Sequence, residues 1–402
     1  MKPIPIQTIR EKAIEVLHGS CLPQGIAASA QQADNYRRIW ARDGIMTGIT
    51  GITIGDEYII EHLAKTIHYL GQYQDQSGII PSNVGVESKP TVSFGSTAGR
   101  VDATAWWIIG ALLLLKDYPQ LLKNVENLEE KVLKAIGVME IWEMNLGNLI
   151  YTPIGGNWAD EYVIQGHTLY DNTLRLWGLK LAASVLADKQ LTDKAGRVEE
   201  KIKQNFWYST DHDTPRYHKE AYARVGRDPG YLFASIGPMG YDTRWDCAGN
   251  ALGLLLGFTE KKDQTEAFLH GLSEDLPERL IPAFWPVIEP KDAEWSFLKD
   301  NYNYRFKNKP YHFHNGGSWP IFSGLMCLAM AYQEKPEIAT LIHESMTKAL
   351  EREEPAYRFF EYFDTEKGQA QGVQQLCYSA SGWLLSDLAV SGDFDRLKHI
   401  LS

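Results

Sequence analysis

Two carboxylates in this 402-residue chain stand in settings suited to acid–base chemistry. Glu361 is flanked on both sides by aromatic residues in the segment 359–363. A carboxylate among apolar neighbours acquires a shifted pKa and a fixed direction. Asp102 stands at the start of an apolar stretch that contains Trp106 and Trp107. One group that donates a proton and one that accepts a proton make the pair that general acid–base catalysis requires.

Each of the two carboxylates also has a structural explanation. Asp102 occupies a position typical of a helix N-cap, and capping favours the ionised form, which has no proton to donate. A catalytic Asp102 therefore requires burial against the two tryptophans that follow it, or a second carboxylate nearby. Glu361 could instead lie on an edge strand and point to water while its neighbours point inward. If Asp102 or Glu361 is not catalytic, Asp43 and Asp160 are the carboxylates predicted to take its role.

Four loops contribute further groups that can bind a ligand rich in hydroxyls. Arg and Asp side chains together donate and accept hydrogen bonds, and a Gly-Gly turn lets the backbone approach a ligand closely. The candidate binding residues are Trp40, Arg42, Asp43, Trp158, Asp160, Glu161, His314, Asn315, Trp319 and Gln375. Asp43 could instead cap the helix that follows it, with Arg42 as its partner.

The histidines of the 311–320 loop do not predict a metal site. His312 and His314 stand two residues apart, a spacing that is common in strands and loops, and no third ligand is evident. We therefore expect His314 to contact the ligand directly, and we predict no metal and no cofactor.

The composition favours a carbohydrate as that ligand. The chain has 12 Trp and 20 Tyr, many of them beside Gly, Asn, Asp and Gln, so that flat apolar rings stand next to hydrogen-bonding groups. Sugars present both kinds of surface, although aromatic residues can also simply fill a large core. The formal net charge of −11 disfavours nucleic acid and anionic membrane surfaces, because these require clustered Lys and Arg. We predict a small-molecule carbohydrate partner and no nucleic-acid or membrane partner. The sequence does not predict the oligomeric state.

Cysteine usage and the N-terminus predict a cytoplasmic protein. The four cysteines are far apart and follow no metal or redox spacing. The first residues lack the apolar region of a signal peptide, and no stretch is long and apolar enough to span a membrane.

Helical periodicity recurs along the whole chain and predicts an all-α fold. We expect helices at 7–18, 43–54, 57–73, 102–117, 126–146, 171–188, 192–207, 245–258, 261–273, 317–334, 336–351 and 375–390. Strand signals are few, and they lie at 148–152 and 359–363.

Apolar helices alternate with more charged helices, and the apolar ones begin at a regular spacing. Their leading residues are Asp43, Asp102, Asp171, Asp246, Gly317 and Leu376, so by subtraction the successive starts are 59, 69, 75, 71 and 59 residues apart. This period predicts a ring of six helical hairpins, an (α/α)6 toroid, with the apolar helices inside and long loops forming the site at one end. We predict a single domain over residues 1–402. Two stacked helical bundles, divided near 209–230, are the alternative.

Four motifs resemble those of the six-hairpin, or (α/α)6-barrel, glycoside hydrolases. They are residues 40–43 (Trp-Ala-Arg-Asp), 101–106 (Val-Asp-Ala-Thr-Ala-Trp), 314–320 (His-Asn-Gly-Gly-Ser-Trp-Pro) and 361–364 (Glu-Tyr-Phe-Asp). The chain is similar to neutral/alkaline invertases and to amylo-α-1,6-glucosidase (glycogen-debranching) proteins over most of its length. The resemblance implies that Asp102 is the general acid and Glu361 the general base of an inverting mechanism. It also implies that Arg42 and Asp43 hold the reacting sugar.

Together these observations predict an inverting glycoside hydrolase that cleaves an α-glucosidic bond in a small soluble oligosaccharide or glycoside. Inversion requires the two carboxyl groups to be roughly 6.5–9.5 Å apart, whereas about 5–5.5 Å implies retention. One alternative is a sugar epimerase or isomerase, which would use His167, His312 and His314 as acid and base. The other is a carbohydrate-binding protein without catalysis.

Overall fold

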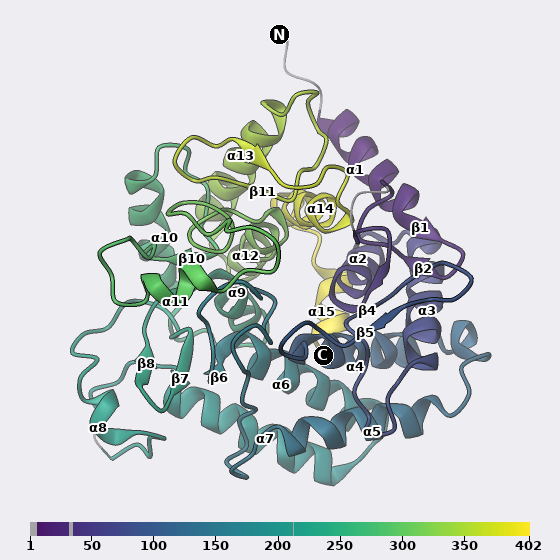
Figure 1. The fold of residues 1–402 in the computed structure, drawn as a ribbon, viewed down its shortest axis with the longest axis horizontal. Coiled ribbons are helices and arrows are strands. Elements are labelled where there is room, and N and C mark those ends of the chain that lie inside the picture. The colour runs from purple at the N-terminus through teal and green to yellow at the C-terminus, as the bar shows by residue number, and fades with distance from the viewer. Residues whose placement is uncertain (1–5, 32–34, 212) are drawn as a thin grey trace.

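The computed structural model describes residues 6–31, 35–211 and 213–402, and its main helices form two concentric rings (Figure 1). The inner helices are α2 (Ala41–Ile54), α4 (Val101–Asp117), α6 (Leu169–Val185), α9 (Cys247–Leu255), α12 (Pro320–Tyr332) and α14 (Cys377–Ser391). Each inner helix contacts the next one, and α14 contacts α2, so the inner ring is closed.

Each inner helix has an outer partner. The outer helices are α1 (Ile6–Ser20), α3 (Glu57–Gln72), α5 (Leu128–Ile141), α7 (Lys189–Asn205), α10 (Lys262–Asp275) and α13 (Pro336–Glu351). Five of them follow an inner helix in the chain, and α1 packs against α14 to complete the sixth pair. The predicted toroid of six helical hairpins is therefore confirmed, and the alternative of two stacked bundles is excluded by the closed inner ring.

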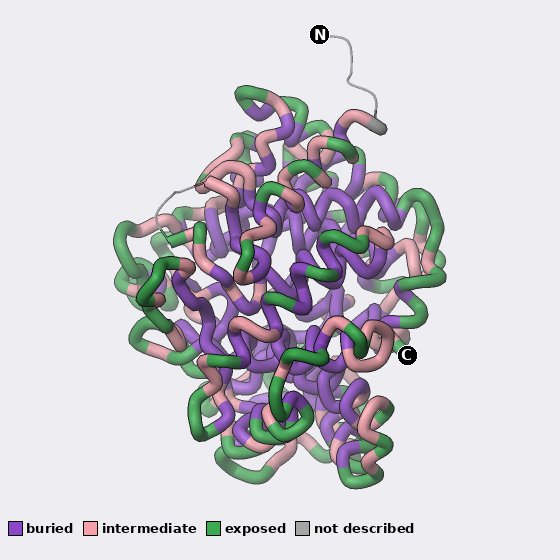
Figure 2. The backbone as a smooth tube through the Cα atoms, turned by 90° about the vertical axis from the view of Figure 1, so that its right-hand side faces the viewer, coloured by how far each residue is buried: buried purple, intermediate pink, exposed green. Residues whose placement is uncertain are grey.

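The two rings differ in burial for a physical reason. An inner helix is surrounded by protein on all sides, so it must be apolar all round. In α4 every residue from Val101 to Leu114 is buried. In the outer helix α7 the buried residues recur every three or four positions, because only one face meets the protein. Figure 2 shows the resulting arrangement, with buried segments inside and exposed ones at the loops and the outer surface.

Short strands tie the long loops together. They are β1 (Cys21–Leu22), β2 (Gly25–Ile26), β3 (Ile39–Trp40), β4 (Asn83–Val84), β5 (Val92–Ser93), β6 (His167–Thr168), β7 (Ser235–Gly237), β8 (Gly240–Asp242), β9 (Trp245–Asp246), β10 (Phe284–Trp285), β11 (Tyr362–Phe363) and β12 (Ala370–Gln371). All named pairs are antiparallel. Because β3, β6 and β9 end directly where α2, α6 and α9 begin, these strands fix the loops at the first turns of the inner helices.

Several predicted element ends are wrong. The helix predicted at 126–146 ends at Ile141, because Met144, Leu146 and Asn148 have positive φ angles that no helix contains. The strand predicted at 148–152 is only a single bridge from Thr152, and of the strand predicted at 359–363 only β11 forms. The short helices η1 (Pro119–Leu122), α8 (Lys219–Tyr222), α11 (Trp295–Asp300) and α15 (Asp395–Leu401) were not predicted.

The helices of the described ranges include none that combines the length and the apolar character needed to cross a membrane.

The inner helices α12 and α14 cross at two glycines. A Cβ on Gly382 would overlap the backbone of Pro320 and Ile321, and a Cβ on Gly324 would overlap the backbone of Gly382. We expect Gly382→Ala to lower the free energy of unfolding by about 1–3 kcal/mol, because a closed ring resists separation of two of its members. The measurement is denaturant or thermal unfolding.

Gly196→Ala in the outer helix α7 is the control, because nothing lies within 4 Å of its Cβ. This control is expected to be neutral or stabilising by up to about 1 kcal/mol. Equal stability of Gly382→Ala and the wild type would contradict the tight crossing.

Candidate active site

The first turns of α2 and α4 bring three charged residues together. The Nη1 atom of Arg42 lies 3.0 Å from Oδ2 of Asp102, and its Nε lies 3.8 Å from Oδ2 of Asp43. The Asp102 side chain is 1% exposed, and the hydroxyl of Tyr170, at the start of α6, lies 3.5 Å from its Oδ2. Burial raises the pKa of Asp43, and the charge of Arg42 opposes that rise. The Arg42 guanidinium thus bridges carboxylates from two neighbouring inner helices.

The helix-cap explanation for Asp43 and Asp102 is wrong. The residues at the N-cap positions of α2, α4 and α6 are Trp40, Arg100 and Thr168, so Asp43, Asp102 and Asp171 lie inside the first turn. Asp246 alone caps its helix, accepting a hydrogen bond from the backbone N–H of Gly249. A carboxylate in the first turn still gains from the helix dipole. Capping nevertheless does not account for the positions of Asp43 and Asp102.

Glu361 lies directly before β11, and its carboxylate is buried and held in a fixed direction. The Tyr36 hydroxyl donates to its Oε1 at 2.6 Å. Burial raises the pKa of Glu361, while the Tyr36 hydrogen bond and the charge of Lys307 oppose the rise. Gly372, with φ of +83°, leaves the space that the carboxylate occupies, because a Cβ there would overlap Oε2 of Glu361. The prediction that Glu361 is a directed, buried carboxylate is borne out, and the edge-strand alternative that points it to water is wrong.

Hydrogen bonds to Asp171, in the first turn of α6, hold the loop between α5 and α6. The Oδ2 atom of Asp171 accepts hydrogen bonds from Asn157 at 2.9 Å, from Thr168 at 2.6 Å and from Thr152 at 2.9 Å. Asn157 in turn accepts from the N–H of Ala159 at 3.0 Å. Burial and the charge of Asp102 raise the pKa of Asp171 to about 7. This network fixes the start of the loop that carries Trp158, Asp160 and Glu161.

The two carboxylates at the tip of this loop have different surroundings. The Asp160 side chain is 25% exposed and forms an ion pair with Arg100. Glu161 is buried, and its Oε1 lies 3.3 Å from Nζ of Lys307, while no described residue hydrogen-bonds its Oε2. Burial raises the pKa of Glu161, and the charge of Lys307 opposes the rise. Asp160 is therefore the one that faces solvent.

An aromatic wall adjoins these charges. Trp158 stacks on Phe284 with ring centroids 5.8 Å apart, and its ring meets those of His314 and Trp319 at 5.1 and 5.4 Å, both near right angles. No described residue hydrogen-bonds Nε1 of Trp158 or Nδ1 of His314, although both are buried. Burial and the charges of Lys307, Arg42 and Arg100 lower the pKa of His314, so its ring is neutral. Both nitrogens are thus buried without a hydrogen-bond partner among the described residues.

Side-chain contacts join these loops. Trp319, beside Trp158, stacks on Tyr362 with ring centroids 5.8 Å apart, and Arg42 and Arg100 pair with Asp102 and Asp160. Burial raises the pKa of Tyr36, and the charges of Glu361, Asp43 and Asp160 add to the rise. His314 is likewise near cations from three separate segments. The predicted residues of the α2, α4, α6 and α12 loops are thus brought together with Glu361.

Three predicted binding residues use their polar groups for hydrogen bonds within the protein. The amide of Asn315 is fully used by the backbone, accepting from the N–H of Ile288 and donating to the carbonyls of Ile288 and Asn308, so it does not reach a ligand. Trp40 is half-buried and donates its indole N–H to the carbonyl of Asn35. Gln375 is half-buried with φ of +52°, and its backbone N–H donates to the carbonyl of Arg358.

The structure adds Tyr36, Arg100, Lys307 and Tyr378 to the site. The buried Tyr378 hydroxyl has no hydrogen-bond partner in the described residues, and the Arg42 guanidinium lies 5.9 Å from its ring. Tyr36, Arg100 and Tyr378 stand within a few residues of the predicted Trp40, Asp102 and Gln375, but nothing local distinguishes them from core aromatics or surface cations. Lys307 lies in a loop with two Asn-Tyr pairs, at 301–304, and this polar–aromatic density was the available signal.

Within the described residues, no three His, Cys, Asp or Glu side chains are grouped so that they could hold a metal ion. All four cysteines are unpaired.

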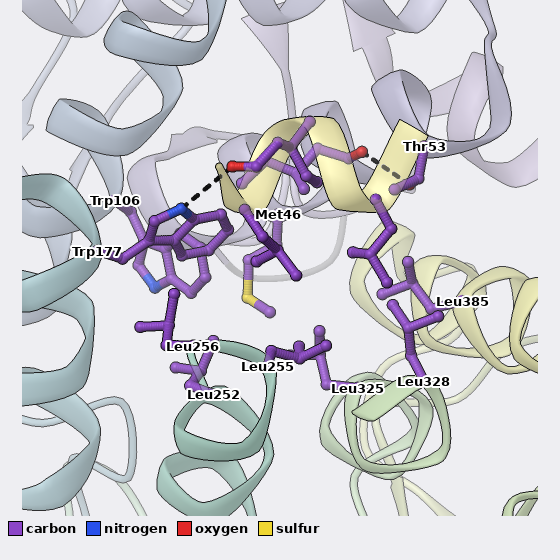
Figure 3. Close-up of a pocket in the computed structure, with 14 residues that line it drawn as sticks. Met46, Thr53, Trp106, Trp177, Leu252, Leu255, Leu256, Leu325, Leu328 and Leu385 are labelled. Atoms are coloured by element: carbon purple, nitrogen blue, oxygen red, sulfur yellow. Dashed lines mark hydrogen bonds between the residues drawn. The ribbon is translucent and has the colours of Figure 1, made fainter. Parts of the chain in front are cut away.

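A separate apolar cavity lies deeper among the inner helices and is not the site (Figure 3). Thr53 and Leu255, from the last turns of α2 and α9, lie in its lining, and α15 contributes Leu397, Ile400 and Leu401. None of the lining residues is a carboxylate. The helix α15 thus fills the end of the ring away from the first turns, where the charged residues gather.

The chain is similar to known proteins over most of its length. The family described as alkaline and neutral invertase matches residues 214–392, the part of the chain that contains His314, Trp319 and Glu361. The probable alkaline/neutral invertase A of Arabidopsis thaliana is 23% identical over 457 aligned residues, which cover 95% of this chain and 69% of that protein. The neutral/alkaline invertase 3 of Oryza sativa subsp. japonica is 23% identical, with 94% of this chain and 73% of that protein covered.

Solved structures show the same fold. The mannosylglycerate hydrolase of Thermus thermophilus superposes with a TM-score of 0.66 at 13% identity, covering 94% of this chain and 99% of that chain. A bacterial glucoamylase in complex with acarbose gives a TM-score of 0.62 at 15% identity, covering 98% of this chain and 57% of that chain. The chain therefore has the (α/α)6-barrel fold that these solved structures share, and it is similar in sequence to the alkaline and neutral invertases.

Proposed function

We propose that this protein cleaves an α-glucosidic bond in a small oligosaccharide or glycoside with inversion at the anomeric carbon, and that residues 1–402 act as one catalytic domain. The observation that carries the proposal is the buried carboxylate of Glu361, whose Oε1 accepts a hydrogen bond from the Tyr36 hydroxyl at 2.6 Å. The charges of Asp43 and Asp160 also act on that hydroxyl. The names of the relatives suggest sucrose and glycosides of glycerate as the first substrates to test.

Glu361 is the general base in this proposal. It takes a proton from a water molecule whose oxygen attacks the anomeric carbon from the face opposite the leaving group. The Tyr36 hydroxyl stabilises the ionised form and aims the carboxylate. Arg42 and Asp43 hold the sugar hydroxyls, and Trp158 and His314 supply an apolar face with free ring nitrogens.

The general acid is Asp160 in this proposal, although the sequence favoured Asp102. The Asp102 side chain is only 1% exposed and lies 3.0 Å from the Arg42 guanidinium, so it is buried as the partner of that cation. Asp160 also forms an ion pair, with Arg100, but its side chain is 25% exposed and lies outside any helix, so it is the more accessible of the two carboxylates to solvent and to a leaving group. Asp102 then orients Arg42 toward the sugar.

No observation favours the epimerase alternative. The Nδ1 atom of His167 is 3.0 Å from the carbonyl of Ile150, and its ring packs between Tyr151 and Tyr217. His314 lies near the charges of Lys307, Arg42 and Arg100, whereas His167 contacts the carbonyl of Ile150 and these two tyrosine rings.

We also propose a cytoplasmic location, because four unpaired cysteines suit a reducing compartment. A small carbohydrate is the proposed partner.

The test is a screen of sucrose, trehalose, isomaltose and glucosyl-glycerate, with the first product followed by NMR. The expected result is hydrolysis of at least one of them, with the β-anomer of glucose appearing first. The α-anomer as first product would overturn inversion. An isomerised sugar without cleavage would overturn hydrolysis, and so would tight binding without turnover.

Tyr36→Phe is expected to move the acidic limb of the kcat/KM profile to higher pH. Removal of the donor raises the pKa of Glu361, because the hydrogen bond stabilises only the ionised form. A general base acts when ionised, so the variant needs a higher pH to reach full activity. The measurement is kcat/KM against pH for both proteins. An unshifted acidic limb would contradict the role of Tyr36.

A further inference from the structure

We propose that Tyr302 and Tyr304 form a stacking platform for the leaving group of the substrate, and that this group is a second sugar ring. The inference rests on the proposed hydrolysis, in which the leaving group lies beside the carboxyl that protonates it.

The platform stands on the 301–308 loop, which is fastened at both ends. Asn301 donates to the carbonyl of Tyr162 at 3.0 Å, and Asn308 donates to the carbonyl of Glu161 at 2.7 Å. Phe306 packs edge-on against Trp295 of α11, with ring centroids 5.7 Å apart. The loop is therefore fixed to the same segment that carries Asp160.

Between these anchors, Asn303 reaches the proposed general acid. Its Nδ2 lies 3.4 Å from Oδ2 of Asp160 and 3.3 Å from Oε1 of Glu161. Tyr302 and Tyr304 are the chain neighbours of Asn303 on either side. Along the chain, each tyrosine is thus one residue from the side chain that contacts Asp160.

Both rings are open to solvent. Tyr304 is 89% exposed and Tyr302 is 48% exposed, and within the described ranges neither ring stacks on another. An exposed aromatic ring gains free energy when a flat apolar face covers it, and one face of a pyranose or furanose ring presents C–H groups of this kind. The buried wall around Trp158 and Arg42 suits the reacting sugar, so the open platform beside Asp160 is left for the leaving group.

The experiment compares the double variant Tyr302→Ala/Tyr304→Ala with the wild type, using α-glucosyl fluoride as substrate. Fluoride fills no leaving-group position, so kcat/KM is expected to stay within about twofold. Glucose, sucrose, trehalose and isomaltose are then tested as inhibitors of this hydrolysis. We expect the Ki of glucose to be unchanged and the Ki of the tightest disaccharide to rise about tenfold. Tyr58→Ala on α3, 45% exposed, is the matched control and should change neither Ki.

Unchanged disaccharide Ki values in the double variant would overturn the platform. Failure of the wild type to cleave the fluoride would count against the proposed function, and a second measurement tests the platform independently of turnover. In saturation-transfer NMR with the inactive variant Glu361→Gln and the same disaccharides, signals from the second ring should vanish in the triple variant while those from the first ring persist. Persisting second-ring signals would overturn the platform.

Discussion

Glu361→Gln is expected to lower kcat by about 10²–10⁴-fold on every glycoside, α-glucosyl fluoride included. Glutamine keeps the size and one acceptor of the side chain, but it cannot take a proton from the attacking water. A good leaving group does not relieve this defect, because water attack is needed whatever group departs. The measurement is steady-state kinetics on the fluoride and on the best disaccharide of the screen.

Glu366→Gln is the matched control for this variant. Glu366 is exposed in the same segment, after β11, and its substitution should leave kcat unchanged. Circular dichroism and the Tm should show both variants folded. A folded Glu361→Gln protein with near wild-type turnover on either substrate would remove Glu361 from the mechanism.

Asp160→Asn is expected to lower kcat much more on a disaccharide than on α-glucosyl fluoride. On a disaccharide kcat should fall by about 10²–10⁴-fold, because an alkoxide is a poor leaving group without a proton. On α-glucosyl fluoride the loss should be below about tenfold, because fluoride departs without full protonation. This selective loss is the signature of a general acid, and it differs from the uniform loss expected for Glu361→Gln.

Asp102→Asn decides between the two candidate acids. If Asp102 orients Arg42, its variant should raise KM and lower kcat/KM on both substrates alike. The original prediction for Asp102 would instead be correct if Asp102→Asn showed the selective loss and Asp160→Asn cleaved disaccharides normally.

The sequence predicted the ring because the starts of its inner helices recur at a regular spacing along the chain. Six apolar stretches at intervals of 59 to 75 residues require six buried helices, and the closed contact of α14 with α2 bears this out. The cap positions were wrong because Asp is favoured both at the cap and in the first turn, so residue type alone could not separate them. Thr168 and Trp40, the true N-cap residues, make no capping hydrogen bond with their side chains, and the sequence therefore held no local sign of them.

The site was harder to predict because its key contacts join distant loops. Tyr36 and Glu361 are 325 residues apart, and no periodic pattern connects them. The partners of Lys307 and Asn303 lie in the α5–α6 loop, far away in the chain. Loop backbones such as that of Gly372 set these contacts, and their φ angles are not encoded by hydrophobic pattern.

The position of α15 has a consequence for the order of events in a catalytic cycle. Because α15 lines the cavity at one end of the ring, a sugar bound near Arg42 in the proposed reaction is expected to leave by the loop end. The leaving group, which in this proposal lies nearer the loop end, is then expected to depart first and the monosaccharide last. A monosaccharide that leaves last competes with new substrate, so we expect the free sugar to inhibit the enzyme as it accumulates.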